Sequence, residues 1–296
     1  MKKIILDTDI GGDIDDALCL AYLLAQPECN LLGITTVTGE PHKRAELASA
    51  ICVNAGKGDI PIYAGIAEPL IRNQNQPIAD QYSKITGWKR ETEFSSDTIE
   101  FMRRTIYANP NEVTLLAIGP LTNVAVLFAT DPKIPSLLKE LVIMGGRFKN
   151  DLPWFTMAEW NILCDPHAAQ MVFSKVGKNI RCIGLDVTMH VKIDRAESMR
   201  KLGEIDTLKP VVDFAEVFFR HSDTMIFHDP LAAAIIFDEN ICTFERGNIV
   251  ETELCGRVAG LTHWEADSNG KHNIAVSVEA DRFFEHYFGT VAAYTR

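Results

Sequence analysis

The sequence predicts an α/β fold: an open, mostly parallel sheet flanked by helices, with a small antiparallel addition near the C-terminus. Short continuous apolar runs, such as residues 4–6 and 113–118, alternate with helix-like segments. Such runs are typical of strands that helices cover on both faces of a parallel sheet. From about residue 248 to 278 the apolar runs follow one another closely, which favours an antiparallel hairpin. No linker or repeat interrupts the chain, so we expect a single domain over residues 1–296.

Each predicted element follows from its residue pattern. Short β-branched and aliphatic runs predict strands at Lys3–Leu6, Asn30–Val37, Val113–Ile118, Leu141–Met144 and Ile180–Leu185. Longer segments predict helices at Asp15–Gln26, Lys43–Ala55, Asp97–Ala108, Leu121–Thr130 and Asp165–Ser174, and a closing helix from Asp281. Asp229 before Pro230 predicts one more helix start, because proline favours the first helical position.

The composition bounds the partners and the compartment. The formal net charge of −11 argues against nucleic acid and anionic membranes as partners. The N-terminal apolar run stops at Asp7, too early for a signal peptide, and no apolar stretch is long enough to span a membrane. The seven cysteines are scattered and form no CxxC pattern. We therefore expect a cytoplasmic protein with reduced thiols.

Five aspartates cluster directly after the first predicted strand, at Asp7, Asp9, Asp13, Asp15 and Asp16. Carboxylates at a strand end and a helix start suit a hard cation, Ca²⁺ or Mg²⁺. An EF-hand loop is excluded, because Gly11 and Leu18 occupy positions that need oxygen ligands. The alternative is that one or two of these aspartates only cap the following helix, where negative charge is favoured.

Other polar residues are predicted to converge on the same place. In open parallel sheets, ligands bind beyond the carboxyl ends of the strands. The residues that follow predicted strands are Asp7, Asp9, Glu40, Gly119, Gly145 and Asp186. His228 and Asp229 form a pair at a predicted helix start. Glu159 and Asn161 are expected on one side of an extended segment, with Trp160 on the other, where an acceptor and an amide suit sugar hydroxyls.

A DxD pattern after an apolar strand also occurs in the haloacid-dehalogenase phosphatases. In that alternative Asp7 is the phosphoryl acceptor and Asp9 the acid and base. The pattern is incomplete, because Gly11 stands where Thr or Val is expected, and it leaves Asp15 and Asp16 unexplained.

Taken together, these patches resemble the nucleoside hydrolase family of the inosine-uridine preferring type. The similarity runs nearly end to end and includes the ordered stretches ILDTDIGGDIDDAL, LLGITTVTG, PIYAGIAEPL, AIGPLTN, LVIMGG, AEWNILCDPHAA, IGLDVT and HDP. The resemblance implies an open α/β sheet and hydrolysis of the N-glycosidic bond of ribonucleosides, giving ribose and free base. It also implies a tightly held Ca²⁺, a role in purine or pyrimidine salvage, and a homodimer or homotetramer.

The resemblance also implies roles for single residues. Asp9, Asp16 and Asp229 match calcium carboxylates, and Ile118 matches a residue whose backbone carbonyl binds the metal. Asp15 matches a carboxylate shared by ribose and metal, while Glu159 and Asn161 match ribose ligands. His228 matches the residue that protonates or contacts the leaving base. Aromatic side chains such as Trp160 or Phe227 would also stabilise this base. We expect Asp9 to be the general base that deprotonates the attacking water.

The chain departs from the family pattern around the substrate. Its acidic loop is two residues longer than the usual Asp-x-Asp-Pro-Gly-x-Asp-Asp, with Ile10 in place of proline, so Asp13 competes with Asp15 as a ligand. Glu40 and Pro153 stand where the family usually has asparagines, although Glu40 remains a candidate substrate contact. A calcium-containing nucleoside- or sugar-binding protein with little turnover is therefore the alternative function.

Overall fold

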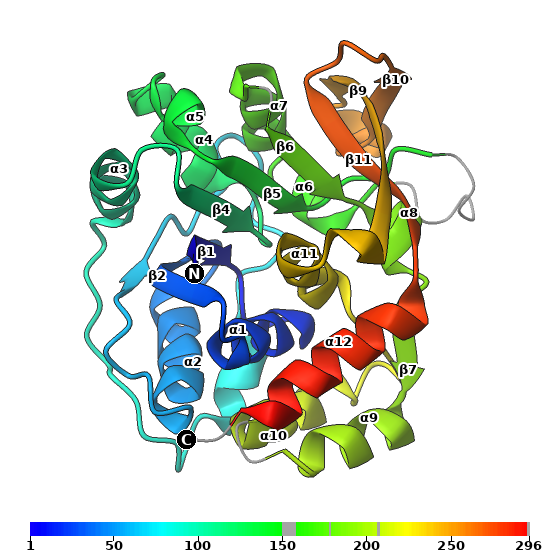
Figure 1. The fold of residues 1–296 in the computed structure, drawn as a ribbon. Helices are drawn as coiled ribbons and strands as arrows, with labels where there is room; N and C mark the ends of the chain where they lie inside the picture. Colours follow the sequence, from blue (N-terminus) through cyan, green and yellow to red (C-terminus); the bar gives the residue numbers. More distant parts are fainter. Residues whose placement is uncertain (150–157, 178, 206–207, 295–296) are drawn as a thin grey trace.

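The computed structural model describes residues 1–149, 158–177, 179–205 and 208–294. Within these residues the centre is a nine-stranded sheet in the order β10-β9-β11-β6-β5-β4-β1-β2-β3 (Figure 1). Its strands are β1 Lys2–Thr8, β2 Cys29–Thr36, β3 Ile62–Ala64, β4 Val113–Ala117, β5 Glu140–Met144, β6 Ile180–Ile183, β9 Cys242–Thr252, β10 Thr262–Ala266 and β11 His272–Val278. All neighbours from β11 to β3 are parallel, whereas β9 is antiparallel to both its neighbours.

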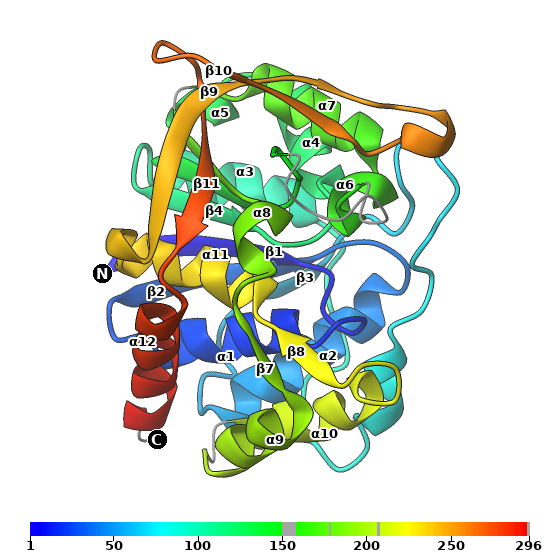
Figure 2. The same ribbon diagram turned by 90° about the vertical axis from the view of Figure 1, so that its right-hand side faces the viewer.

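Helices cover the sheet on both faces (Figure 1). One layer contains α1 Asp15–Ala25, α2 Pro41–Asn54, α8 Leu185–Thr188, α9 Arg195–Gly203, α10 Lys209–Phe218, α11 His228–Phe237 and α12 Ala280–Ala293. The other contains α3 Thr98–Ala108, α4 Thr122–Thr130, α5 Ile134–Leu137 and α7 Pro166–Lys175. A separate two-stranded antiparallel sheet of β7 Lys192–Asp194 and β8 Thr224–Ile226 runs between α8 and the α9–α10 pair (Figure 2).

The two cores follow from the alternation of side chains along each strand. In β1, Ile4 and Leu6 pack against the layer of α1 and α11, whereas Ile5 packs against α3 and α4. In β5, Val142 and Leu141 face the two layers in the same way. Burial on both faces explains why these strands are continuous apolar runs.

The predicted fold class is confirmed, and the predicted strands and helices are present with shifts of a few residues at their ends. The strand predicted to reach Leu185 ends at Ile183, because Leu185 already begins α8. Helix α11, whose start was predicted at Asp229 and Pro230, begins at His228. The β7–β8 sheet and the helices α9 and α10 are absent from the sequence prediction.

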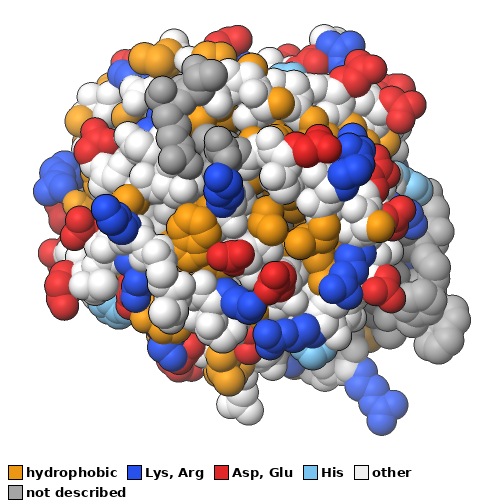
Figure 3. Space-filling view, turned by 90° about the horizontal axis from the view of Figure 1, so that it is seen from below, with side chains coloured by type: hydrophobic (Ala, Val, Ile, Leu, Met, Phe, Trp, Pro, Cys, Tyr) orange, Lys and Arg blue, Asp and Glu red, His pale blue; other side chains and the backbone are white. Residues whose placement is uncertain are grey.

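The surface adds two observations. In the described residues no helix has both the length and the apolar character that a membrane span needs. Seen from below, charges of both signs are dispersed between apolar side chains, and no field of a single sign covers this face (Figure 3).

Candidate active site

Side chains from six segments line one cavity of about 270 Å³ beyond the carboxyl ends of the central strands. Its lining comprises Asp9, Asp13, Asp15, Asp16, Gln76, Ile118, Met144, Glu159, Trp160, Asn161, His228 and Asp229. The acidic loop follows β1, Ile118 follows β4, and Met144 ends β5. The predicted convergence of distant residues beyond the strand ends is thus what the fold produces.

Three carboxylates form the centre of this cavity. Asp15, Asp16 and Asp229 each offer an oxygen, and these oxygens lie within 4.8 Å of one another. All three side chains are buried in the first turns of α1 and α11, where backbone N–H groups favour negative charge. The Asp229 N–H donates to Asp15 Oδ2 at 3.2 Å, and the Thr8 hydroxyl donates to Asp16 Oδ1.

Burial makes this cluster unfavourable unless protons or a cation neutralise it. Desolvation raises the pKa of Asp15, Asp16 and Asp229 well above the ordinary range, and repulsion between their charges raises it further. Three convergent carboxylate oxygens are a donor set that fits a hard divalent cation. The carbonyl oxygen of Ile118 accepts from Asn161 Nδ2 at 2.8 Å and keeps a second lone pair for such an ion.

Asp9 lies beside this triad and is not a member of it. Asp16 and Gln76 line the same cavity as Asp9. Burial raises the pKa of Asp9, and the nearby Arg44 guanidinium opposes that rise. A Cβ atom on Gly119 would lie 2.8 Å from Asp9 Oδ1, so a glycine is needed where β4 ends.

A buried arginine, which the sequence did not predict, holds the acidic loop by hydrogen bonds to its backbone. Arg44 is fully buried in α2. Its Nη1 donates to the carbonyls of Asp9 and Ile10, and its Nε donates to the Thr38 carbonyl at 2.8 Å. Its position in the polar stretch PHKRAEL resembles an ordinary solvent-facing helix turn, so the sequence offers no signal for this role.

The lengthened part of the acidic loop is held by a buried glutamine. Gln81 belongs to the short 3-10 helix η1, Asp80–Lys84. Its backbone N–H donates to Gly11, and its Nε2 donates to the carbonyls of Gly12 and Asp13. The Asp13 side chain is exposed at the cavity rim, outside the carboxylate triad. The structure therefore favours Asp15 over Asp13 as the ligand candidate.

The segment around Trp160 is helical, so the prediction that Glu159 and Asn161 lie on one side of an extended segment is wrong. Trp160–Cys164 forms the short helix α6, and Glu159 is its N-cap. The Glu159 carboxylate accepts from the N–H groups of Asn161 at 2.7 Å, Ile162 at 3.0 Å and Gly146 at 3.2 Å. A cap needs its side chain to bend back over the first turn, which an extended segment does not allow. Burial nevertheless raises the pKa of Glu159 to about 7.

Three further side chains complete the lining in the predicted place. Asn161 Nδ2 is used on the carbonyls of Ile118 and Met144, which leaves Oδ1 as its acceptor. Trp160 is 50% exposed at the mouth. His228 is half-buried, its Nδ1 lies 2.7 Å from Thr188 Oγ1, and burial lowers its pKa to about 4.

Several other positions that the sequence singled out are used elsewhere in the fold. Glu40 is the N-cap residue of α2. Its carboxylate pairs with Lys43 at 2.5 Å and accepts from the Ala79 N–H at 3.2 Å, in the loop before η1. Asp186 instead accepts from the N–H groups of Phe148 and Lys149. Phe227 is fully buried against the aromatic side chains of α12. Pro153 lies outside the described residues.

The geometry of Asp7 argues against the phosphatase alternative. Asp7 is completely buried, and its Oδ1 accepts from Thr35 at 2.6 Å and from Asn123 at 2.8 Å. It does not line the cavity. A phosphoryl acceptor must be reachable by substrate, so Asp7 serves to connect β1 with β2 and α4.

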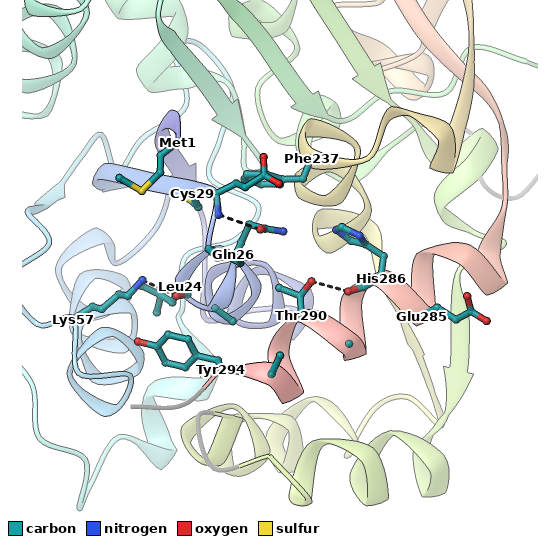
Figure 4. Close-up of a pocket in the computed structure, with 15 residues that line it drawn as sticks. Met1, Leu24, Gln26, Cys29, Lys57, Phe237, Glu285, His286, Thr290 and Tyr294 are labelled. Atoms are coloured by element: carbon teal, nitrogen blue, oxygen red, sulfur yellow. Dashed lines mark hydrogen bonds between the residues drawn. The ribbon is translucent and has the colours of Figure 1, made fainter.

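A larger cavity of about 740 Å³ lies elsewhere, between the C-terminal end of α1, the start of β2 and α12 (Figure 4). Its polar groups, among them Lys57, His286 and Thr290, bond to neighbouring protein groups rather than converge on one point. Among the described residues that line it, no three carboxylates cluster as Asp15, Asp16 and Asp229 do. The smaller acidic cavity is therefore the better candidate for chemistry.

Comparisons with known proteins match the chain over nearly its whole length. The profile of the family described as "Inosine-uridine preferring nucleoside hydrolase" matches residues 4–285. An inosine-uridine preferring nucleoside hydrolase of Leishmania major is 32% identical, over 96% of this chain and 95% of the relative. A pyrimidine-specific ribonucleoside hydrolase of Salmonella arizonae is 33% identical over 94% of both chains. A solved plant nucleoside hydrolase superposes with a TM-score of 0.83, at 25% identity and 99% coverage of both chains.

We expect the stability of the metal-free protein, prepared with a chelator, to fall as the pH rises from about 5 to 8. In the folded state the pKa values of Asp15, Asp16 and Glu159 are raised, so these groups keep protons that the unfolded chain releases near pH 4. The stabilisation present at low pH is therefore lost as the pH rises through the folded-state pKa values, of which that of Glu159 is about 7. Thermal unfolding at several pH values measures this, and adding a divalent cation should restore the loss at pH 8. A midpoint that is constant or rises over this range contradicts the prediction.

Replacement of Gly119 by alanine should destabilise the fold by about 1–3 kcal/mol, as is usual for overpacking. The new Cβ would lie 2.8 Å from Asp9 Oδ1 and 2.9 Å from Val37 Cγ1, so the acidic loop would have to shift. Denaturant unfolding measures the loss of stability, and cation titration measures how the shift of the acidic loop changes cation binding. Gly289→Ala is the control, since no atom lies within 4 Å of its added Cβ. Equal stability of both variants would contradict the prediction, because it would show that the acidic loop can shift without a loss of stability.

Proposed function

Because this chain belongs to the inosine-uridine preferring nucleoside hydrolase family, whose members cleave the N-glycosidic bond of nucleosides, we propose that it is a calcium-dependent ribonucleoside hydrolase. The products would be ribose and the free base. The observation that carries the proposal is one cavity in which the triad of Asp15, Asp16 and Asp229 faces Glu159 and Asn161. A cation site beside an acceptor and an amide suits the diol of a ribose.

Calcium is proposed because every candidate ligand atom is oxygen. Ca²⁺ accepts six to eight oxygen ligands in flexible geometry, and imidazole is a poor ligand for it. Asp15, Asp16 and Asp229 would hold the ion, with Asp9 and the carbonyl of Ile118 at its side. When bound, such an ion holds ribose hydroxyls and raises the acidity of a water in the cavity.

The protein's own groups supply the remaining chemistry. Asp9 would take the proton from the attacking water at its carboxylate. The glycosidic bond breaks toward an oxocarbenium-like ribosyl cation, which the surrounding carboxylates stabilise. Glu159, fixed by three N–H donors, and Asn161, with Oδ1 as its acceptor, would bind ribose hydroxyls in a preset orientation.

His228 would assist the leaving base through a hydrogen bond. Because its pKa is lowered to about 4, the ring is neutral at pH 7 and is no imidazolium donor. If the Thr188 hydroxyl donates to Nδ1, the ring proton resides on Nε2, which can then donate to the base. Trp160, at the cavity mouth, would stack on that base.

Several finer properties belong to this proposal. The relatives are named for inosine and uridine or for pyrimidines, so base preference has to be measured. A cytoplasmic location agrees with the free state of all seven cysteines, six of them buried. The homodimer or homotetramer stays a prediction, which light scattering would test.

The proposal predicts release of reducing sugar from ribonucleosides, with about one Ca²⁺ per chain in elemental analysis. Asp9→Asn should fold normally yet lower turnover on the order of 10²-fold or more, through loss of the base. Glu40→Gln is the matched control and should stay near the wild-type rate, because Glu40 does not line the cavity. Nucleoside binding without ribose release would instead identify a binding protein, and zinc in place of calcium would refute the metal assignment.

His228→Ala should slow hydrolysis of inosine by roughly 10²-fold, because a poor leaving group loses its hydrogen-bond donor. A nitrophenyl riboside needs no such donor and should react at nearly the wild-type rate. Steady-state kinetics on both substrates give the comparison. Equal losses would assign His228 to ribose positioning, which contradicts the proposed role.

A further inference from the structure

The ring of His228, which is proposed to assist the leaving base, has one hydrogen-bond partner among the described residues. Its Nδ1 lies 2.7 Å from Oγ1 of Thr188. Thr188 is fully buried and is the last residue of α8. His228 lines the cavity, and its Nε2 has no partner in the described part of the chain. Nε2 is therefore the ring nitrogen that is left for a ligand.

The hydroxyl proton of Thr188 decides which ring nitrogen of His228 is protonated. Among the described residues, Nδ1 of His228 is the only group that forms a hydrogen bond with this hydroxyl. A helical threonine often donates to the carbonyl one turn earlier, but the Gly184 carbonyl already accepts the N–H groups of Val187 and Thr188, each at 3.2 Å. A buried hydroxyl that donates to nothing is unfavourable. Thr188 therefore donates to Nδ1, and the ring proton lies on Nε2.

The two-stranded β7–β8 sheet sets the position of the hydroxyl against the ring. Strand β7 leads out of α8, and β8 leads into α11, so the sheet joins the segments that carry Thr188 and His228 (Figure 2). Beside this pairing, the Phe227 N–H donates to the Val191 carbonyl at 2.9 Å. The Val191 N–H in turn donates to the Thr188 carbonyl at 3.0 Å, and His228 directly follows Phe227. Backbone bonds thus connect the two residues of the pair.

The residues around this connection are rigidly enclosed. Val191, Met225 and Phe227 are fully buried, and they belong to the same core as α1 and α11. Closely packed cores resist small displacements of their side chains. The hydroxyl of Thr188 is therefore presented to His228 from a fixed position.

We infer that Thr188 is a positioning residue, which holds the ring of His228 in the tautomer that carries its proton on Nε2. The inference rests on the proposed hydrolase function, in which His228 donates a hydrogen bond to the leaving base. In the opposite tautomer Nε2 would present a lone pair to the base and could donate nothing. The β7–β8 sheet thereby contributes to the reaction, although neither of its strands lines the cavity.

Two substitutions of Thr188 separate its hydroxyl from its shape. Thr188→Val removes the hydroxyl and keeps the branched side chain, whereas Thr188→Ser keeps the hydroxyl. We expect Thr188→Val to lower kcat on inosine by about 10-fold with little change in KM, because the donor of His228 is misdirected rather than removed. A nitrophenyl riboside needs no donor and should react at nearly the wild-type rate. Thr188→Ser should stay near the wild-type rate on both substrates.

A double variant and a matched control test whether Thr188 acts through His228. In the His228→Ala background, Thr188→Val should cause no further loss on inosine, because the ring that it positions is absent. Thr114→Val is the control, since it also removes a buried hydroxyl, which donates to Glu140 at 3.2 Å. Neither Thr114 nor Glu140 lines the cavity, so kcat on both substrates should be unchanged.

A ¹⁵N spectrum of the histidine rings checks the tautomer without turnover. The chain has eight histidines, and the pair of ring signals that is missing in His228→Ala belongs to His228. In the wild-type protein we expect these signals to show a protonated Nε2 and an unprotonated Nδ1. The Nδ1 signal should move in Thr188→Val, which lacks the hydrogen-bond donor, and should stay nearly unchanged in Thr188→Ser.

A protonated Nδ1 of His228 in the wild-type protein would overturn the inference. Three kinetic results would also overturn it: a wild-type kcat of Thr188→Val on inosine, equal losses on both substrates, and losses that multiply in the double variant. The wild-type spectrum needs no change at Thr188, so it decides the tautomer even where Thr188→Val fails to fold. A wild-type protein that releases no ribose from any nucleoside would instead refute the proposed function, and the spectrum would still decide the tautomer.

Discussion

The concentration of negative charge at one point of the interior is the constraint that organises the site. Asp15, Asp16 and Asp229 meet where α1 and α11 both begin, so two helix N-termini face the same carboxylates. This meeting requires that α1 and α11 pack side by side on one face of the sheet, which the shared core beneath them provides. Arg44 adds a buried positive charge without occupying the carboxylates, since it bonds carbonyls of the loop. The carboxylates thus remain available for a cation, and their repulsion is a reason for the site to bind one.

Much of the fold could be predicted because the pattern that encodes it is local. Strands such as β1 and β4 are buried on both faces and read as apolar runs, and the helices between them have lengths that periodicity reveals. The two-stranded β7–β8 sheet could not be found in this way, since strands of three residues carry no periodicity. The aspartates of the site were equally visible, four of them within one loop and the fifth beside a proline at a helix start.

The rest of the site depends on contacts that no sequence pattern records. Arg44 and Gln81 act by hydrogen bonds to backbone carbonyls of segments distant along the chain, and Gln76 accepts from the Trp160 indole N–H. In the sequence, none of the three differs from an ordinary polar surface residue. The error at Glu159 has a related cause. Its spacing with Asn161 fits an extended segment, but two N–H donors at the start of α6, joined by the N–H of Gly146 after β5, stabilise a cap instead. Sequence therefore named the acids, whereas the groups that orient them required the three-dimensional arrangement.

The edges of the central sheet have a consequence for self-association. The outer strand β3 has only three residues, and the bridge between Tyr63 and Ser95 covers part of its free side. At the opposite edge, β10 is short and carries exposed His263 and Glu265, and its pairing with β9 shifts register. Short, covered or charged edges are poor templates for a further strand. Growth of the sheet from one copy into another is disfavoured at both ends, so copies of this chain would have to meet through helices and loops.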